Sequence, residues 1–141
     1  PYCIEATYTE DDFVHDINSN VVREFKSITP YALLAVLNSK VLSFWFVHYF
    51  DKLQRKTFPQ FKANELAVFP VPSGNNELLS FLDAAGLELD TFTKKISVLE
   101  PGFNSYEVMV SRIKDIEEKI EKALCDHYEF SKEEMAYLSS F

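Results

Sequence analysis

Cationic and amide side chains gather in one short stretch of the chain, between Asp51 and Asn64. Its lysines and arginine can neutralise phosphates, and its amides can bond to base edges: Lys52, Gln54, Arg55, Lys56, Gln60, Lys62 and Asn64. A glutamine or asparagine side chain can bond to adenine through two atoms, and an arginine can do the same to guanine. Phosphate contacts position a protein on DNA, whereas base contacts specify the sequence. These seven residues are therefore the candidate DNA-binding residues.

Two plainer interpretations of the same stretch stay open. It can be a solvated loop whose aromatic residues, Phe58 and Phe61, insert into the core. Its charge can also be paired internally, because the chain has a net charge of −8. Residues 1–22 carry five acids and no lysine or arginine, residues 23–64 carry seven basic residues against two acids, and residues 65–141 carry fifteen acids against seven basic residues. A basic middle in an acidic chain is either an anion-binding surface or a partner for its own flanks.

Residues that could carry catalysis or bind a metal do not fall into a recognisable pattern. His15, His48 and His127 form no HExxH, and Cys3 and Cys125 form no CxxC, so we expect no metal site. Cys125 and His127 are two residues apart and would point to different sides of a helix. The cysteines are interpreted as free thiols, as in a cytoplasmic protein.

Cofactor and carboxylate motifs are equally uninformative. The chain contains no GxGxxG and no Walker loop. The acidic run DIEEKIEK (residues 115–122) is typical of the solvated side of a helix, where Glu121 would face water. We therefore predict no catalytic residue and no cofactor in this chain.

The N-terminal part has the pattern of strands. Residues 2–9 (YCIEATYT) alternate and are rich in β-formers, and residues 13–17 and 21–28 are further candidate strands. A short apolar run at residues 67–69 can be another strand, which Pro70 would end because proline donates no ladder hydrogen bond.

The remaining pattern is helical. Thr29 can cap a very apolar helix of about twenty residues that has Pro30 at its first position. Its polar residues, including Asn38 and Lys40, indicate a buried core helix rather than a membrane span. Asn76 can cap the next helix, with Gly86 as a weak point or break.

A longer helix is expected from about Ser105 to Tyr128. Ser131 and Glu134 have the spacing of a capping box, which predicts a short terminal helix. We therefore predict an α+β fold, with a small, mostly antiparallel sheet, a buried apolar helix and a helical C-terminal half. Residues 1–141 would be one domain, with strands, core helix and basic loop in 1–72 and a helical part in 73–141. Because it begins with Pro1 inside a predicted strand, we expect it to be part of a longer chain.

Two segments together, YALLAVLNSKVLSFWFVHYF and FPQFKANELAVFPVP, resemble a known family. The matching positions are Leu33, Leu34, Leu37, Asn38, Ser39, Lys40, Leu42, Phe44 and Phe46, then Phe61, Lys62, Leu66, Phe69, Pro70, Val71 and Pro72. Tyr128, Ser131, Glu133 and Glu134 match the family's C-terminal pattern. The chain resembles the TaqI-like C-terminal specificity domain, the target recognition domain of Type IIG restriction–modification enzymes and related N6-adenine DNA methyltransferases.

This resemblance implies a partner and a function. The partner would be double-stranded DNA, read in the major groove, and the domain would not be catalytic. An upstream domain of the same chain would bind S-adenosylmethionine and methylate a flipped adenine, and a nuclease domain can lie further upstream. Asn38 and Ser39 would cap or support the helix, as would Lys40 unless it reaches a phosphate. Because the chain is acidic, we expect it to bind DNA weakly or undetectably when it is alone.

Two other functions remain as alternatives. A protein–protein interaction or dimerisation module of the same kind of system would show an exposed apolar stripe on residues 105–128. An acidic mimic of DNA is disfavoured by the basic middle of the chain.

Overall fold

The computed structural model describes residues 4–15, 19–50 and 62–140, and these residues form six helices with no strand among them. The helices are α1 (Pro30–Leu37), α2 (Lys40–Tyr49), α3 (Ala63–Leu66), α4 (Asn76–Ile96), α5 (Asn104–His127) and α6 (Lys132–Ser140). The predicted α+β fold with an antiparallel sheet is therefore wrong. Residues 4–9 and 19–28 lie outside the helices, and they form no strand ladder in the part of the chain that the structure describes.

The N-terminal segment is held by a side chain instead of by a neighbouring strand. The Ala6 N–H donates to Asn38 Oδ1 at 2.8 Å, and Asn38 Nδ2 donates to the Ala6 carbonyl at 3.0 Å. One amide thus satisfies both backbone groups of Ala6, as a ladder residue would. Ile4 of this segment is buried. The alternating pattern of residues 2–9 did not indicate what the segment would pair with.

The long apolar helix expected after Thr29 is two helices that are bent by 61° at their junction. Ser39 is the residue that starts the second helix: its Oγ donates to the Val36 carbonyl at 2.7 Å and accepts from the Leu42 N–H at 3.1 Å. A serine bonded in this way begins a new helix rather than continuing the old one. The predicted cap at Thr29 is confirmed, since its Oγ1 accepts from the Ala32 N–H at 3.2 Å.

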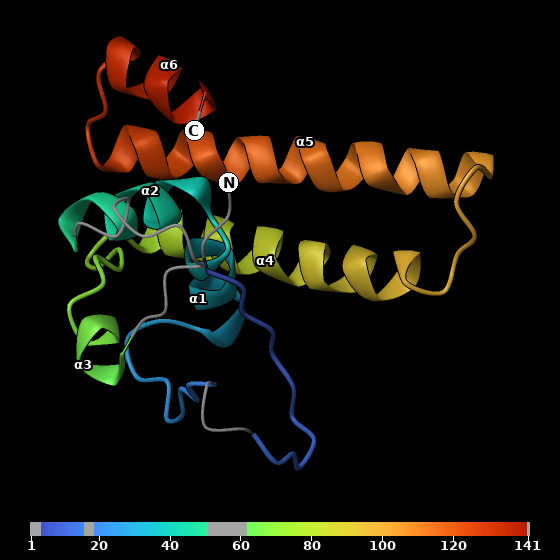
Figure 1. Ribbon diagram of the computed structural model, residues 1–141, viewed down its shortest axis with the longest axis horizontal. Coiled ribbons are helices and arrows are strands. Elements are labelled where there is room, and N and C mark those ends of the chain that lie inside the picture. Colours follow the sequence, from blue (N-terminus) through green and yellow to red (C-terminus); the bar gives the residue numbers. More distant parts are fainter. Residues whose placement is uncertain (1–3, 16–18, 51–61, 141) are drawn as a thin grey trace.

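Helices α4 and α5 form a long antiparallel hairpin, and α1 and α2 pack against one end of it, where α6 contacts α2 (Figure 1). The N-terminal cap of α4 is Asn75, whose Oδ1 accepts from the Leu78 N–H at 3.0 Å, and not the predicted Asn76. Gly86 does not break the helix. A Cβ at Gly86 would lie 2.1 Å from the Tyr31 carbonyl oxygen, so glycine is what lets α1 approach α4 this closely.

The end of α5 turns the chain back onto the body. Glu129 has φ of 57°, and the Phe130 N–H donates to the Cys125 carbonyl at 2.9 Å, which is the pattern of a Schellman motif. The predicted capping box then starts α6 and is confirmed: the Ser131 N–H donates to Glu134 Oε2 at 2.7 Å, and the Glu134 N–H donates to Ser131 Oγ at 3.2 Å.

A single core joins the helices. It contains Phe46 from α2, Leu82 from α4 and Leu124 from α5, each fully buried, and it extends to Leu138 of α6. No single described helix is long and apolar enough to span a membrane. α1 and α2 reach that length and apolarity only as a bent pair.

Candidate nucleic-acid interface

The candidate DNA-binding residues fall in and beside a stretch that the structure does not describe. Lys52, Gln54, Arg55, Lys56 and Gln60 lie outside the described residues. The other two are placed at the start of α3, and both Lys62 and Asn64 are exposed. Helix α3 begins where the Lys62 N–H donates to Glu65 Oε2 at 2.8 Å. That contact uses the backbone of Lys62, and the residue is exposed.

Aromatic contacts join the two sides of the undescribed stretch. On its N-terminal side, α2 contributes Phe46 and Trp45. On its C-terminal side, Phe69 is buried, with its ring centroid 5.9 Å from that of Phe46 and 5.6 Å from that of Trp45. Residues 46 and 69 are therefore fixed next to each other, and residues 51–61 connect two anchored points. The strand predicted at residues 67–69 is absent, so the FPVP sequence serves packing through Phe69 rather than ending a strand.

A hydrogen bond from the C-terminal half fixes the same place. The Tyr128 hydroxyl donates to the Pro70 carbonyl, 58 residues away in the sequence. Burial raises the pKa of Tyr128 to about 12, so the hydroxyl keeps its proton at neutral pH and stays a donor. Tyr128 is one of the positions through which the C-terminal part resembles the family, and its role here is to hold the Pro70 segment.

The start of α2 is held by an acid that the sequence pattern did not identify. Glu121 of α5 accepts from the Lys40 N–H at 2.6 Å and from the Val41 N–H at 3.2 Å. Its carboxylate thus caps a helix far away in the sequence, where the helix dipole favours a negative charge. Glu121 is not on the solvated side of α5, as the run DIEEKIEK suggested. The repeat of glutamates and lysines hid it, because only the tertiary contact distinguishes it from its neighbours.

The LNSK sequence is therefore a structural joint. Asn38 holds Ala6, Ser39 caps α2, and the Lys40 backbone bonds to Glu121. The expectation that Asn38 and Ser39 support the helix is confirmed. Burial raises the pKa of both Glu121 and Glu117, and the positive charge of Lys40 partly opposes this rise.

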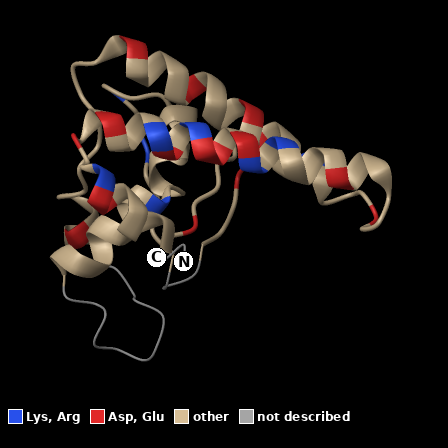
Figure 2. Cartoon of the chain, turned by 90° about the horizontal axis from the view of Figure 1, so that it is seen from above, with Lys and Arg blue, Asp and Glu red and all other residues tan. Residues whose placement is uncertain are grey.

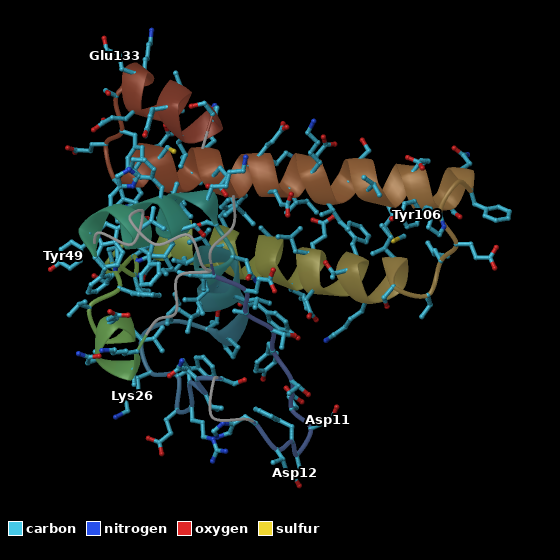
Figure 3. The ribbon with its side chains drawn as sticks, viewed as in Figure 1. Asp11, Asp12, Lys26, Tyr49, Tyr106 and Glu133 are labelled. Atoms are coloured by element: carbon cyan, nitrogen blue, oxygen red, sulfur yellow. The ribbon has the colours of Figure 1, made fainter. Side chains whose placement is uncertain are left out.

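Charge on the described surface is interspersed rather than separated by sign. Figure 2 shows acidic and basic residues alternating along the long helices. Two ion pairs, Lys94–Asp90 at 2.7 Å and Lys114–Glu118 at 3.9 Å, each link residues one turn apart in the same helix. Asp11 and Asp12 are exposed on the N-terminal segment, on the same side of the helical body as Lys26 in Figure 3. The described helices therefore present no extended basic face.

Two described groups that could act as a nucleophile or a base, Cys125 and His48, are constrained by their surroundings. Cys125 is buried, and burial raises the pKa of its thiol to about 11, so it stays protonated at neutral pH. His48 Nδ1 lies 2.7 Å from the Phe44 carbonyl oxygen of its own helix. In the described part of the chain, no three His, Cys, Asp or Glu residues gather closely enough to hold a metal ion.

An apolar cavity of about 230 Å³ lies beside the Tyr128–Pro70 contact. Its walls include Leu42, Trp45 and Leu124, and none of the described residues that line it is charged. It offers nothing that would bind a phosphate or recognise a base edge.

Comparison with known families gives one match. Residues 2–71 match the family described as the TaqI-like C-terminal specificity domain. The match covers the N-terminal segment, the LNSK joint, the candidate DNA-binding residues and the Pro70 segment. No curated protein and no solved structure was found to match the chain.

Proposed function

Because residues 2–71 belong to the TaqI-like C-terminal specificity domain family, we propose that this chain recognises the DNA target sequence of a restriction–modification enzyme. The family is a specificity domain of such enzymes, which supports DNA target recognition in general. The finer proposal is that residues 52–64 contact double-stranded DNA. Their cations would bind phosphates, and their amides would bond to base edges in the major groove.

The observation that carries the proposal is how this stretch is anchored within the matched region. Phe46 and Phe69 fix its two sides beside each other, and Tyr128 holds Pro70 from the C-terminal half. Recognition residues are commonly carried on connecting segments that a rigid scaffold positions. The anchoring residues Phe46 and Phe69 lie outside residues 51–61, so a change of sequence within 51–61 leaves both anchors in place.

The chemistry on DNA would belong to another part of the enzyme. We propose that this chain is not catalytic and that it acts beside an upstream methyltransferase domain, which binds S-adenosylmethionine and supplies methyl transfer to adenine. The three glycines of this chain, at positions 74, 86 and 102, form no glycine-rich loop. Gly86, moreover, is occupied with packing against Tyr31. The residues of this chain therefore do not fit the cofactor, and we place its binding in the other domain, with the enzyme acting in the cytoplasm.

Exchange of the recognition stretch tests this proposal. Residues 51–64 would be replaced, in the full-length protein, by the corresponding residues of another member of the family. Selection from random duplexes would then identify the sequence that each protein binds. A new preferred sequence with an unchanged melting temperature is the expected result. The original preference, retained after the exchange, would contradict the assignment of these residues.

A second candidate function rests on the far end of the α4–α5 hairpin. Figure 1 shows this end extending beyond the helices that pack on the other end. Its exposed apolar residues are Val98, which is 81% exposed, and Phe103, which is 61% exposed, followed by Val108 and Val110 on α5. Exposed apolar groups at the tip of a helical hairpin are typical of a contact with another helical protein or a second copy.

Sedimentation tests this second candidate function by measuring the association state of the chain. The wild-type chain and the variant Phe103→Ser/Val108→Ser would be compared over a range of concentrations. If the hairpin tip is an interaction surface, the wild-type chain should self-associate or bind a partner and the variant should not. Equal sedimentation of both proteins as monomers, with equal binding of partner enzyme subunits, would exclude this role for the hairpin tip.

A further inference from the structure

Tyr49, the last residue of α2, combines exposure with a fixed position. Its side chain is 63% exposed, yet its ring packs nearly flat against Trp45, with centroids 4.7 Å apart and planes at 19°. The ring of Phe50 meets it edge-on at 4.9 Å. Figure 3 shows Tyr49 projecting from the end of the molecule opposite Tyr106.

The support beneath Tyr49 is rigid. Trp45 is itself packed edge-on by Phe50, at 5.8 Å, and by Phe69, at 5.6 Å. Phe69 belongs to the buried core. An aromatic ring that is held in this way loses little conformational freedom when something stacks on it, and this favours binding. Tyr49 therefore has the properties of a preformed stacking surface.

The surrounding sequence indicates what would stack there. Lys52, Arg55 and Lys56 follow Tyr49 in the sequence, so phosphate-binding charge lies close along the chain. Aromatic rings beside cationic residues are the usual means of binding unpaired nucleotides, because every base has a π face. A base within a duplex has both faces covered by its neighbours. A platform of this kind therefore serves a base that has left the stack.

Resting on the proposed function, we propose that Tyr49, backed by Trp45, stacks on an unpaired nucleobase of the bound DNA. Tyr49 would be a DNA-positioning residue additional to the seven in residues 52–64. It would stabilise a locally opened duplex, whereas those residues would contact the paired bases and phosphates.

Nuclear magnetic resonance tests the stacking directly, because Trp45 is the single tryptophan of the chain and gives one indole N–H resonance. The labelled 141-residue chain would be titrated, at low salt, with a single-stranded adenine oligonucleotide. A strand of the same length with abasic sites throughout would be the control ligand. We expect the adenine strand to shift the Trp45 resonance and the abasic strand to leave it in place. Resonance shifts remain measurable at millimolar affinity, so weak binding is sufficient.

Three variants separate stacking from other effects. Tyr49→Phe keeps the ring and should bind the adenine strand like the wild type. Tyr49→Ala should bind it about tenfold more weakly, in line with the loss of one base–aromatic stack. Tyr106→Ala, at the opposite end of the molecule, is the matched control and should have no effect.

The outcomes distinguish this inference from the proposed function. If Tyr49→Ala binds as the wild type does, or if the abasic strand shifts Trp45 equally, the platform is excluded. Duplex binding would in that case leave the target-recognition function intact. If the full-length protein binds neither the single strand nor a duplex, both proposals fail.

Discussion

Phe46 and Phe69 pack their rings 5.9 Å apart at 63° and bring together the two sides of the stretch proposed to contact DNA. Phe46 is fully buried and Phe69 is nearly so. Phe69 therefore has two roles: it stabilises the core, and it fixes the chain that follows the candidate DNA-binding residues. This contact links the stability of the core to the position of the stretch that we propose to contact DNA.

Phe69→Ala should destabilise the chain and weaken site-specific DNA binding together. Removal of a buried phenylalanine ring commonly costs about 3–5 kcal/mol of unfolding free energy. Urea unfolding measures this cost, and DNA affinity would be measured in the full-length protein under conditions in which the variant is folded. Phe81→Ala is the control, because Phe81 is exposed on α4 and its removal should cost little. Equal effects of the two substitutions would contradict the anchoring role of Phe69.

Gly86→Ala should be destabilising, although alanine is the better helix former. The new methyl group would lie 2.1 Å from the Tyr31 carbonyl oxygen, so α1 must move away from α4. Overpacking of this kind costs about 1–3 kcal/mol. Thermal unfolding measures the change, with Ser80→Ala at an exposed site of the same helix as the comparison. A stabilised Gly86→Ala variant would mean that the two helices are less closely packed.

Glu129→Gly should stabilise the chain. Glu129 has φ of 57°, a left-handed conformation that costs a side-chain-bearing residue about 1 kcal/mol or more and that glycine adopts freely. The same substitution at Glu118, exposed in the interior of α5, should destabilise by about 1 kcal/mol. Urea unfolding of both variants measures the two changes in unfolding free energy, which should have opposite signs. A loss of stability at both positions would contradict the Schellman turn.

The pH dependence of stability should contain a contribution from Glu121. Burial raises the pKa of its carboxyl in the folded state, despite the two backbone N–H donors that lower it. The group's favourable contribution to stability is therefore fully present below the usual glutamate pKa of about 4.3 and is lost as pH rises through the raised folded pKa.

Glu121→Gln removes this titration while keeping one oxygen as an acceptor. Unfolding free energies of wild type and variant, measured at a series of pH values above 4.3, should converge or cross as the pH rises. Glu117 also has a pKa raised by burial, so Glu117→Gln is needed to separate the two groups. A wild-type advantage that grows with pH would show that the N–H donors outweigh burial.

The helical parts of the fold could be predicted from the sequence because their determinants are local. Thr29, Ser131 and Glu134 act over three or four residues, and those bonds are present. The prediction of a sheet was wrong because the alternation in residues 2–9 indicates an extended segment but does not supply a second strand to pair with it. Asn38 satisfies that segment through a contact 32 residues away.

The candidate site was only partly predictable for the same reason. The types of residues 52–64 indicated DNA, and the family match supports recognition in general. The anchors of that stretch, Phe69 and Tyr128, act through packing and a long-range hydrogen bond. The cap at Glu121 joins residues about eighty positions apart, and no local pattern reports it.

The most direct test of the account is the charge reversal Arg55→Glu/Lys56→Glu in the full-length protein. Lys119→Glu/Lys122→Glu is the matched control, since it makes the same change in net charge on the exposed side of α5. The affinity for the preferred duplex relative to a random duplex would be measured at fixed salt, together with the melting temperature and adenine methylation at the site. The account predicts that the first variant loses sequence preference and methylation while melting like the wild type, and that the control keeps both. Unchanged preference in a folded Arg55→Glu/Lys56→Glu variant would contradict it.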